Sequence, residues 1–231
     1  MKIAALIPAR KNSKRLPGKN KTQINGDFII NKVLKNLNNC NHDIDLFVSS
    51  DDMELTEIIN VDGVATLDRD VKFNDDYSTV VDLNKWHFSN HLQSYDLVLQ
   101  TFCHSICIDS STFDRAIDKI INSPKSSLLT ISKLDGPVEW TFKIIDGNIK
   151  PNFPNKRNSR SQDLGISFID SGQFYIYKRV WFEKDEIDEY DTDCDWLEIP
   201  NFQSNDLDEE GDIDKLRNNY TLSKSIFDSL A

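Results

Sequence analysis

Two kinds of hydrophobic pattern alternate along the first 133 residues of the chain. Short, nearly continuous apolar runs predict strands that are buried on both faces of a sheet. Apolar residues spaced three or four positions apart predict helices that pack one face against that sheet. The predicted strands cover residues 2–8, 44–49, 63–67, 95–100 and 126–132. The predicted helices cover residues 28–37, 53–59, 109–121 and a stretch that begins at 76–79. This repetition with short connections predicts an α/β fold, with a mostly parallel sheet flanked by helices.

Polar residues precede two of these helices. Ser50-Asp51-Asp52 comes directly before the helix at 53–59, and Asp109-Ser110-Ser111 comes at the start of the helix at 109–121. Side chains of these types accept hydrogen bonds from the N–H groups that the first helical turn leaves unpaired. We therefore expect both segments to cap the helices that follow them.

The hydrophobic pattern changes after residue 133. Apolar residues on both sides of Asp146-Gly147 predict a hairpin, and a polar stretch follows it. Beyond it the patterns predict a strand over 168–177, a solvated acidic segment over 184–195 and a last helix from about residue 209. Because no repeat or long linker divides the chain, we predict a single domain over residues 1–231. Residues 134–165 form an inserted hairpin and loop lobe, which would serve substrate binding or dimer contact.

Composition narrows the class of protein. The 231 residues carry a formal net charge of −11, which disfavours a nucleic-acid binder with a broad basic face. No apolar run approaches the roughly 20 residues of a membrane span. The N-terminal apolar run leads into a charged segment without a signal-peptide cleavage pattern. We expect a cytoplasmic protein that binds neither membrane nor nucleic acid.

Four cysteines are too few for a disulfide scaffold in a chain of this length. Cys103-His104 and Cys107 have the spacing of one corner of a zinc site, but no second pair stands at a suitable distance along the chain. Buried thiols on a strand-to-helix connection are the simpler interpretation.

A cluster of cations follows the first predicted strand. Six of the chain's 27 lysines and arginines lie within twelve residues: Arg10, Lys11, Lys14, Arg15, Lys19 and Lys21. A solvated charged loop is one interpretation. However, ligands of parallel α/β sheets bind beyond the carboxyl ends of the strands, where this loop begins. Its single glycine, Gly18, excludes the glycine-rich phosphate and dinucleotide motifs. Its cationic side chains therefore favour a compact anion such as a triphosphate.

Residues 7–20, IPARKNSKRLPGKN, resemble the signature loop of the CMP-sialic acid synthetases, or acylneuraminate cytidylyltransferases. These enzymes join a nonulosonic acid to CTP and release pyrophosphate. Further segments resemble the family in order: Val48–Glu54, Arg69 with Asp75-Asp76 and Thr79, Leu99-Gln100, and Asp206-Leu207-Asp208. The resemblance implies a Rossmann-like sheet of the nucleotide-sugar transferase type.

Two segments are similar to one branch of that family. Arg160-Ser161-Gln162-Asp163-Leu164 and the later Asp170-Ser171-Gly172-Gln173-Phe174-Tyr175 resemble the pseudaminic acid cytidylyltransferases. That branch typically has Arg-Ser/Thr-Gln-Asp-Leu and then Asp-Ala-Gly-Gln-Phe-Tyr. The resemblance therefore implies pseudaminic acid, or a close nonulosonic acid, as the sugar substrate.

The resemblance also implies roles for individual residues. Arg10 and Lys19 would be catalytic, because neutralising phosphate charge is most of what nucleotidyl transfer requires. The nucleotide would be bound by Pro8, Ala9, Arg10, Lys14, Lys19, Asn20, Arg69, Asp76 and Thr79. The sugar would be bound by Gln100, Arg160, Gln162, Gln173 and Tyr175. Among these, Arg160 would pair with the substrate carboxylate.

A metal site is implied at the late Asp-x-Asp. Asp206 and Asp208 are alternate residues, so both carboxylates would face one ion on an extended chain, and oxygen ligands beside a phosphate suit Mg²⁺. By spacing alone, this acid-rich segment would more simply be the N-terminus of a helix. The implied partners are therefore CTP, Mg²⁺, an acidic nine-carbon keto sugar and a second copy of the chain in a homodimer.

One loop departs from the family pattern. Many members follow the Leu-Gln strand end with Pro-Thr-Ser-Pro or a similar turn, whereas this chain has Thr101-Phe102-Cys103-His104-Ser105. We expect this loop to border the sugar. The departure leaves open a sialic, legionaminic or 3-deoxy-octulosonic acid cytidylyltransferase and a nucleotide-binding relative without catalysis. A glycosyltransferase with an Asp-x-Asp motif fits the cationic loop less well.

Overall fold

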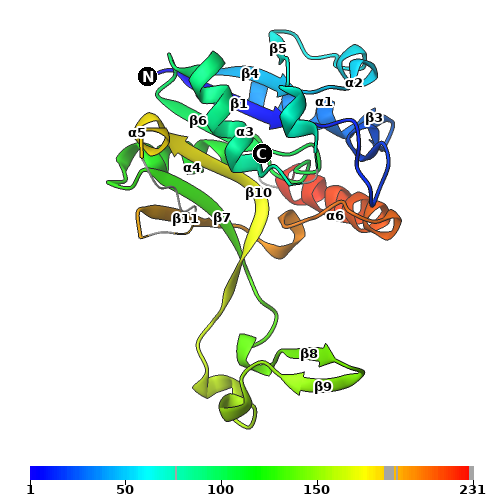
Figure 1. Ribbon diagram of the computed structural model, residues 1–231, viewed down its shortest axis with the longest axis vertical. Coiled ribbons are helices and arrows are strands. Elements are labelled where there is room, and N and C mark those ends of the chain that lie inside the picture. The colour runs from blue at the N-terminus through cyan, green and yellow to red at the C-terminus, as the bar shows by residue number, and fades with distance from the viewer. Residues whose placement is uncertain (76, 185–189, 191, 229–231) are drawn as a thin grey trace.

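The computed structural model describes residues 1–75, 77–184, 190 and 192–228 (Figure 1). Its centre is a seven-stranded sheet with the order β11-β7-β10-β6-β1-β4-β5. The strands are β1 (Ile3–Pro8), β4 (Ile44–Ser49), β5 (Val64–Leu67), β6 (Leu97–Thr101), β7 (Ser127–Lys133), β10 (Phe168–Lys178) and β11 (Cys194–Glu198). Only β10 runs antiparallel to its neighbours β6 and β7, and the other paired strands of this sheet are parallel. The mostly parallel α/β sheet predicted from the sequence is confirmed.

Helices cover both faces of the sheet. One face packs against α1 (Ile29–Asn38), α4 (Ser110–Asn122) and α6 (Glu210–Asp228). The other face packs against the π-helix η3 (Phe88–Leu92) and α5 (Arg179–Phe182). The helix α3 (Val80–His87), which η3 extends, contacts β4 through His87, whose Nε2 lies 2.7 Å from the Ser49 hydroxyl. The short helix α2 (Met53–Glu57) follows β4. The result is a three-layer arrangement in which the sheet lies between helices.

The central strand β1 shows why an apolar run is needed here. Ala5 and Ile7 point into the larger hydrophobic cluster, on the side of α1 and α4. Ala4 and Leu6 point into the smaller cluster, on the side of η3. Because successive side chains of a strand face opposite sides, a strand covered on both faces must be apolar at every position.

The N-terminus of α4 forms as the sequence predicts. Asp109 is the N-cap residue, and its carboxylate accepts a hydrogen bond from the backbone N–H of Thr112 at 3.2 Å. The apolar face of the helix buries Phe113, Ile117 and Ile120 in the core. The expected cap of α2 is different, because the N-cap residue Asp52 makes no side-chain capping hydrogen bond.

Some elements were not predicted, among them the small strands β2 (Gln23–Ile24) and β3 (Asp27–Phe28). The edge strand β11 lies at the end of the segment predicted to be a solvated acidic surface, and α5 follows β10 directly. That prediction is wrong for Cys194 and Asp195, which pair with β7, and residues 185–189 and 191 lie outside the described residues. An edge strand with exposed side chains, such as Trp196 at 52%, lacks the apolar run that marks a buried strand.

The segment between β7 and β10 projects away from the sheet as an arm (Figure 1). Its tip is the antiparallel hairpin β8 (Phe142–Ile145) and β9 (Asn148–Pro151). Asp146 and Gly147 have φ values of 51° and 72°, the left-handed conformation that tight two-residue hairpin turns require. Every residue from Thr141 to Lys150 is exposed, so the hairpin has no packing against the body of the protein.

A second small hairpin, β2 (Gln23–Ile24) with β3 (Asp27–Phe28), links the cationic loop to α1. It follows a single 3₁₀ turn, η1 (Lys19–Lys21), that ends the loop. Among the described helices, none has both the length and the apolar composition that crossing a bilayer would require.

Candidate functional site

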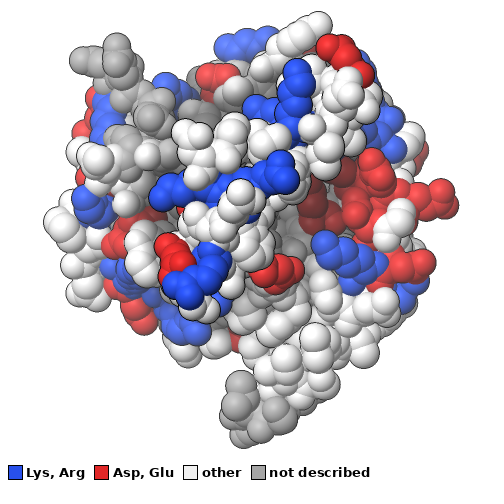
Figure 2. Space-filling model, turned by 90° about the horizontal axis from the view of Figure 1, so that it is seen from below, with Lys and Arg blue, Asp and Glu red and all other residues white. Residues whose placement is uncertain are grey.

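A cavity of about 640 Å³ opens at the carboxyl ends of β1 and β6, where ligands of parallel α/β sheets bind. A smaller cavity of about 310 Å³ adjoins it and is lined by the cationic loop. In the space-filling view, the surface is hollowed beside a group of acidic side chains (Figure 2). The larger cavity is lined by Pro8, Arg10, Arg15, Lys19, Asn20, Arg69, Asp75, Ser78, Thr79, Val80, Phe102, Cys103, His104, Ile169, Asp170, Ser171, Gly172, Tyr175, Ser204, Asn205, Asp206, Asp208 and Lys215.

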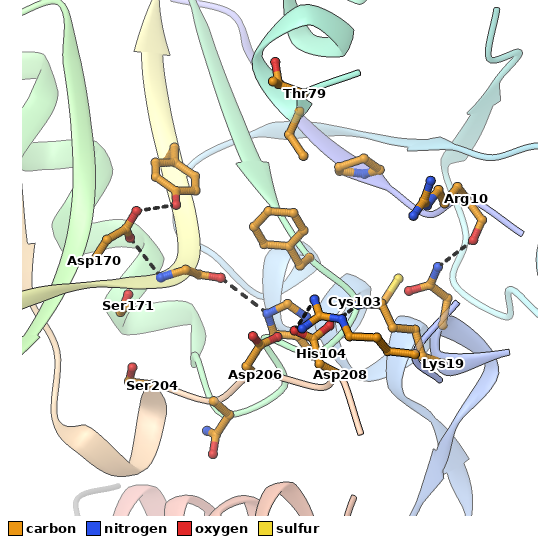
Figure 3. A pocket seen from close by; sticks show the side chains of 18 of the residues that line it. Arg10, Lys19, Thr79, Cys103, His104, Asp170, Ser171, Ser204, Asp206 and Asp208 are labelled. Atoms are coloured by element: carbon orange, nitrogen blue, oxygen red, sulfur yellow. Dashed lines mark hydrogen bonds and ion pairs between the residues drawn. The ribbon is translucent and has the colours of Figure 1, made fainter. Parts of the chain in front are cut away.

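The cationic loop forms one wall of the cavity (Figure 3). The side-chain amide of Asn20 donates a hydrogen bond to the backbone carbonyl of Arg10 at 3.0 Å, which closes the loop on itself. Gly18 adopts φ 72°, and the chain then enters the turn η1 that carries Lys19. Arg10 donates from its guanidinium to the carbonyl of Asp75 at 2.5 Å. These contacts fix cations where a polyanion can be bound.

Arg69 and Thr79 also line the cavity. Arg69 donates from Nε and from a terminal nitrogen to the carbonyl of Phe73, at 3.1 and 2.7 Å. Burial lowers the pKa of Arg69 from its ordinary value, although nearby Asp51 opposes that effect. Thr79 caps α3 in a reciprocal arrangement with Asp82. The predicted ligand Asp76 lies outside the described residues.

The opposite wall comes from an irregularity in β10. The pairing of β10 with β7 shifts between Asp170 and Tyr175, and Gly172 in this bulge has φ 63°. The carboxylate of Asp170 accepts hydrogen bonds from the Tyr175 hydroxyl at 2.7 Å and from the Gly172 amide at 2.9 Å. The bulge therefore presents a carboxylate and the side chain of Tyr175 to the cavity, whereas the Ser171 hydroxyl donates to Oγ1 of the buried Thr130 at 2.6 Å.

The loop after β6 forms the floor next to this bulge. The rings of Phe102 and His104 are stacked, with centroids 5.2 Å apart. Nε2 of His104 lies 3.3 Å from the carbonyl oxygen of Gly172. Burial lowers the pKa of His104, and the nearby carboxylate of Asp206 acts in the opposite direction. This loop borders the cavity, as expected, and it lies next to the bulge of β10.

Asp206 and Asp208 lie between the two walls (Figure 3). Asp208 is paired with Lys19 at 3.0 Å and with Arg15 at 2.6 Å. Burial raises the pKa of Asp208, but the hydrogen bond from Lys19 and the positive charges of Lys19 and Arg15 outweigh that effect and leave the pKa below its ordinary value. Asp208 is therefore a carboxylate that can bind a metal ion.

The donor set fits Mg²⁺ only if the substrate completes it. In the described part of the chain, no three His, Cys, Asp or Glu side chains gather as a metal site. Two carboxylates facing a cavity with cationic phosphate-type groups match the way Mg²⁺ is usually held, with one or two protein carboxylates and the rest from phosphates and water.

The cysteines provide no zinc corner among these residues. Cys103 and Cys107 are buried free thiols on the connection that follows β6. Burial raises the pKa of each thiol to about 12. Both groups are therefore neutral at physiological pH, as in the simpler interpretation of the sequence.

Most of the residues that the sequence singled out are brought together. The cavity is lined by Pro8, Arg10, Lys19, Asn20, Arg69, Thr79, Tyr175, Asp206 and Asp208. Lys14 lines the adjoining cavity. Ala9 is buried directly behind the cationic loop. The two halves of the predicted site are thus separated by up to about 200 residues of sequence but share one cavity.

Four predicted sugar ligands lie elsewhere. Gln100 and Gln173 are buried side chains of β6 and β10 and do not line the cavity. Arg160 and Gln162 are exposed on the arm, where the Arg160 guanidinium is paired with Asp163 at 2.7 and 3.0 Å. A sugar-binding role for these four residues stays a prediction.

Sequence reasoning missed much of the wall formed by the bulge and the late loop. Asp170, Ser171 and Gly172 stand in the segment that resembles one family branch, so that segment was the available signal. Ser204, Asn205 and Lys215 carried no signal, because each is an ordinary polar residue near a helix start. Their position depends on how η7 (Asn201–Gln203) and α6 pack against the sheet.

Comparison with known proteins identifies relatives over most of the chain. A family model described as "Cytidylyltransferase" matches residues 4–184. A pseudaminic acid cytidylyltransferase of Campylobacter jejuni subsp. jejuni serotype O:2 is 31% identical over 193 residues, which are 81% of this chain and 83% of that protein. The protein of the same name from serotype O:23/36 is 30% identical, with the same coverage of both chains.

Solved structures are similar in fold. A CMP:2-keto-3-deoxy-manno-octonic acid synthetase complexed with CTP superposes with a TM-score of 0.69, at 16% identity, over 97% of this chain and 100% of the other. The 4-diphosphocytidyl-2C-methyl-D-erythritol synthase of Anaerococcus prevotii gives a TM-score of 0.65 at 13% identity, over 94% and 95%. At these identities the similarity shows the fold alone.

Proposed function

The chain belongs to the cytidylyltransferase family, and on that premise we propose that it activates pseudaminic acid with CTP. The products would be the CMP-sugar and pyrophosphate. The observation that carries the proposal is the cavity with two unlike walls, one of phosphate-type cations and one of a carboxylate, hydroxyls and aromatic rings. The choice of sugar is supported by two relatives named pseudaminic acid cytidylyltransferases at 31% and 30% identity.

In this proposal the cationic wall binds the triphosphate. The anomeric hydroxyl of the sugar attacks the α-phosphorus and loses its proton to water. A new bond forms between that oxygen and the α-phosphorus, and the bond from the α-phosphorus to the oxygen of the β-phosphate breaks, which releases pyrophosphate. Negative charge accumulates on the phosphate oxygens, so Arg10 and Lys19 stabilise the transition state and the leaving pyrophosphate. Lys14, from the adjoining cavity, lies where the outer phosphates would extend.

The nucleoside would lie on the side of the cavity lined by Arg69 and Thr79. Pro8, Ala9, Asn20, Arg69, Asp76 and Thr79 are the residues proposed to bind it. Asp206 and Asp208 would hold Mg²⁺, which when bound supplies charge neutralisation at the phosphate oxygens. Keeping the two substrates on opposite walls would orient the sugar hydroxyl toward the α-phosphorus.

The location of Arg160 supports a homodimer in this proposal. Arg160 and Gln162 lie on the projecting arm and do not line the cavity of their own subunit. The same arm exposes a row of apolar side chains: Phe142 at 49%, Ile144 at 81%, Ile145 at 41%, Ile149 at 69% and Phe153 at 41%. We propose that the arms of two copies cover these side chains and that Arg160 and Gln162 thereby reach the sugar carboxylate of the second copy.

Pyrophosphate release tests the proposal. The purified protein is incubated with CTP and Mg²⁺, and pseudaminic acid, N-acetylneuraminic acid, legionaminic acid and 3-deoxy-octulosonic acid are offered in parallel. Release with pseudaminic acid and with none of the others is the expected result. Release with a different sugar would move the substrate assignment to that sugar. No release with any sugar, from folded protein that still binds CTP, would favour the relative without catalysis.

A further inference from the structure

The turn that joins β4 to α2 contacts the cationic loop instead of capping its own helix. The sequence predicts Ser50-Asp51-Asp52 as an N-cap segment, yet Asp52 makes no side-chain capping hydrogen bond. The Ser50 hydroxyl instead donates to the carbonyl of Ala9 at 2.7 Å and accepts from the amide of Asp52 at 3.0 Å. The polar side chain of Ser50 therefore binds the backbone of the cationic loop and does not cap α2.

Asp51 makes the second contact. Its carboxylate accepts a hydrogen bond from the backbone amide of Lys11 at 2.7 Å. The backbone amide of Ala9 also donates to the carbonyl of Ser49 at 2.9 Å. The residues on both sides of Arg10 are thus tied to the end of β4.

A third contact closes the far end of the loop. The ammonium group of Lys21 lies 3.1 Å from the carboxylate of Asp52 and 2.5 Å from that of Glu54. Between these attachments, residues 9–18 form no helix or strand. Lys19 is held by the backbone hydrogen bonds of η1, but Arg10 lies in the irregular part of the loop, so its geometry depends on contacts from outside the loop.

We infer that Ser50 and Asp51 are positioning residues for the nucleotide-binding loop, an inference that rests on the proposed function. Neither residue is among the described residues that line the cavity. They bind the backbone carbonyl of Ala9 and the backbone amide of Lys11, and so fix the direction in which the side chain of Arg10 points. A loop held in its binding geometry loses less conformational entropy when CTP binds.

The carboxylate of Asp51 provides a test that separates positioning from charge. It contacts the backbone amide of Lys11 and lies close enough to the cavity-lining Arg69 to raise the pKa of that residue, so its negative charge opposes the binding of a triphosphate. If charge were its only effect, removing it would strengthen CTP binding equally in Asp51→Ala and Asp51→Asn. If positioning matters, Asp51→Ala weakens binding, while Asp51→Asn keeps an oxygen acceptor for Lys11 and restores it.

The experiment measures CTP binding by titration calorimetry in the presence of Mg²⁺, for the full chain and its variants. We expect the dissociation constant to rise about 10-fold in Asp51→Ala and about 10-fold in Ser50→Ala, because each variant loses one hydrogen bond to the backbone of the cationic loop. Asp51→Asn and Ser50→Thr should keep at least about one third of the wild-type affinity for CTP. Asp62→Ala, an exposed aspartate on the connection after α2, is the matched control.

Turnover gives a second readout that general destabilisation would not move. The KM for CTP should rise in Asp51→Ala while the KM for the sugar stays unchanged, and thermal unfolding should confirm that both variants are folded. Equal changes in Asp51→Ala and Asp51→Asn, or no change in either, would overturn the inference and leave the proposed function intact. A wild-type protein that fails to bind CTP would overturn both.

Discussion

The ammonium group of Lys19 lies 3.0 Å from Oδ1 of Asp208, although the two residues are 189 positions apart in the chain. The guanidinium of Arg15 approaches the other carboxylate oxygen of Asp208 at 2.6 Å. Asp208 is therefore the counter-ion of both cations. CTP with Mg²⁺ carries both kinds of charge, so in the proposed function the lysine turns to phosphate and the carboxylate turns to the metal. Binding exchanges ion pairs without leaving a charge unpaired.

This relationship predicts that Lys19→Ala lowers turnover by orders of magnitude but leaves the fold intact. Loss of a group that stabilises the transition state costs on the order of 100- to 1000-fold in kcat. The ion pair with Asp208 is partly exposed, and such pairs contribute about 1 kcal/mol or less to the free energy of unfolding. Pyrophosphate release and thermal unfolding measure the two effects. Lys11→Ala, an exposed cation of the same loop, is the control, and near-wild-type turnover in Lys19→Ala would refute the role of that lysine.

The metal assignment predicts a change in ion binding that can be measured without turnover. Asp208→Asn removes one of two carboxylate ligands, so we expect the affinity for Mn²⁺, bound together with CTP, to fall at least about 10-fold. Electron paramagnetic resonance of free Mn²⁺ reports that affinity directly. Asp214→Asn removes an exposed charge on α6 that pairs with Arg217, and it should bind Mn²⁺ as the wild type does. Equal affinities in the two variants would place the metal elsewhere.

The parts of the fold that could be predicted are those with a local physical cause. The apolar run of β1 is required because both faces of that strand are covered, and the helical spacing of α4 is required because one face packs. Asp109 caps α4 through a contact three residues away, which the local sequence contains. The exposed edge strand β11 has no such cause, because its strand conformation comes from pairing with β7.

The candidate site divides in the same way. The cationic loop is contiguous, and its place after the first strand predicts where it lies in an α/β fold. The facing wall is assembled from a bulge in β10, the loop after β6 and the segment before α6. Those contacts depend on the packing of distant segments, so only a resemblance to a known family pointed to them. Arg160 does lie in the inserted segment 134–165 predicted from the sequence, but its absence from the residues that line the cavity was not contained in its local sequence.

The proposed homodimer predicts that a charge on the arm separates the two copies. Ile144 is 81% exposed at the hairpin β8–β9, and a carboxylate at its position would have to be buried without a partner in the dimer. We expect Ile144→Asp to elute as a monomer in size-exclusion chromatography with light scattering, and to lose turnover if Arg160 serves the second copy. Val180→Asp, at a position 52% exposed on α5 of the body, is the matched control. A dimeric Ile144→Asp would exclude this part of the arm as the contact.

His87 predicts how stability depends on pH. Its ring is buried on α3, with Nε2 2.7 Å from the Ser49 hydroxyl, and burial lowers its pKa to about 4, with further lowering from His91 and Arg69. The unfolded chain takes up that proton near the ordinary value of about 6.5, so below it the unfolded state binds more protons than the folded state. The contribution of His87 to the free energy of unfolding is therefore complete above about pH 6.5 and is lost as the pH falls toward 4, by at most about 1.4 kcal/mol per pH unit.

His87→Asn removes the titrating group, so it should be less stable than the wild type at about pH 7.5 but should lose less free energy of unfolding between about pH 7 and pH 5. Urea unfolding at both pH values measures the difference, in which the contributions of all other groups cancel, and parallel losses in the two proteins would show that His87 is not held neutral by burial.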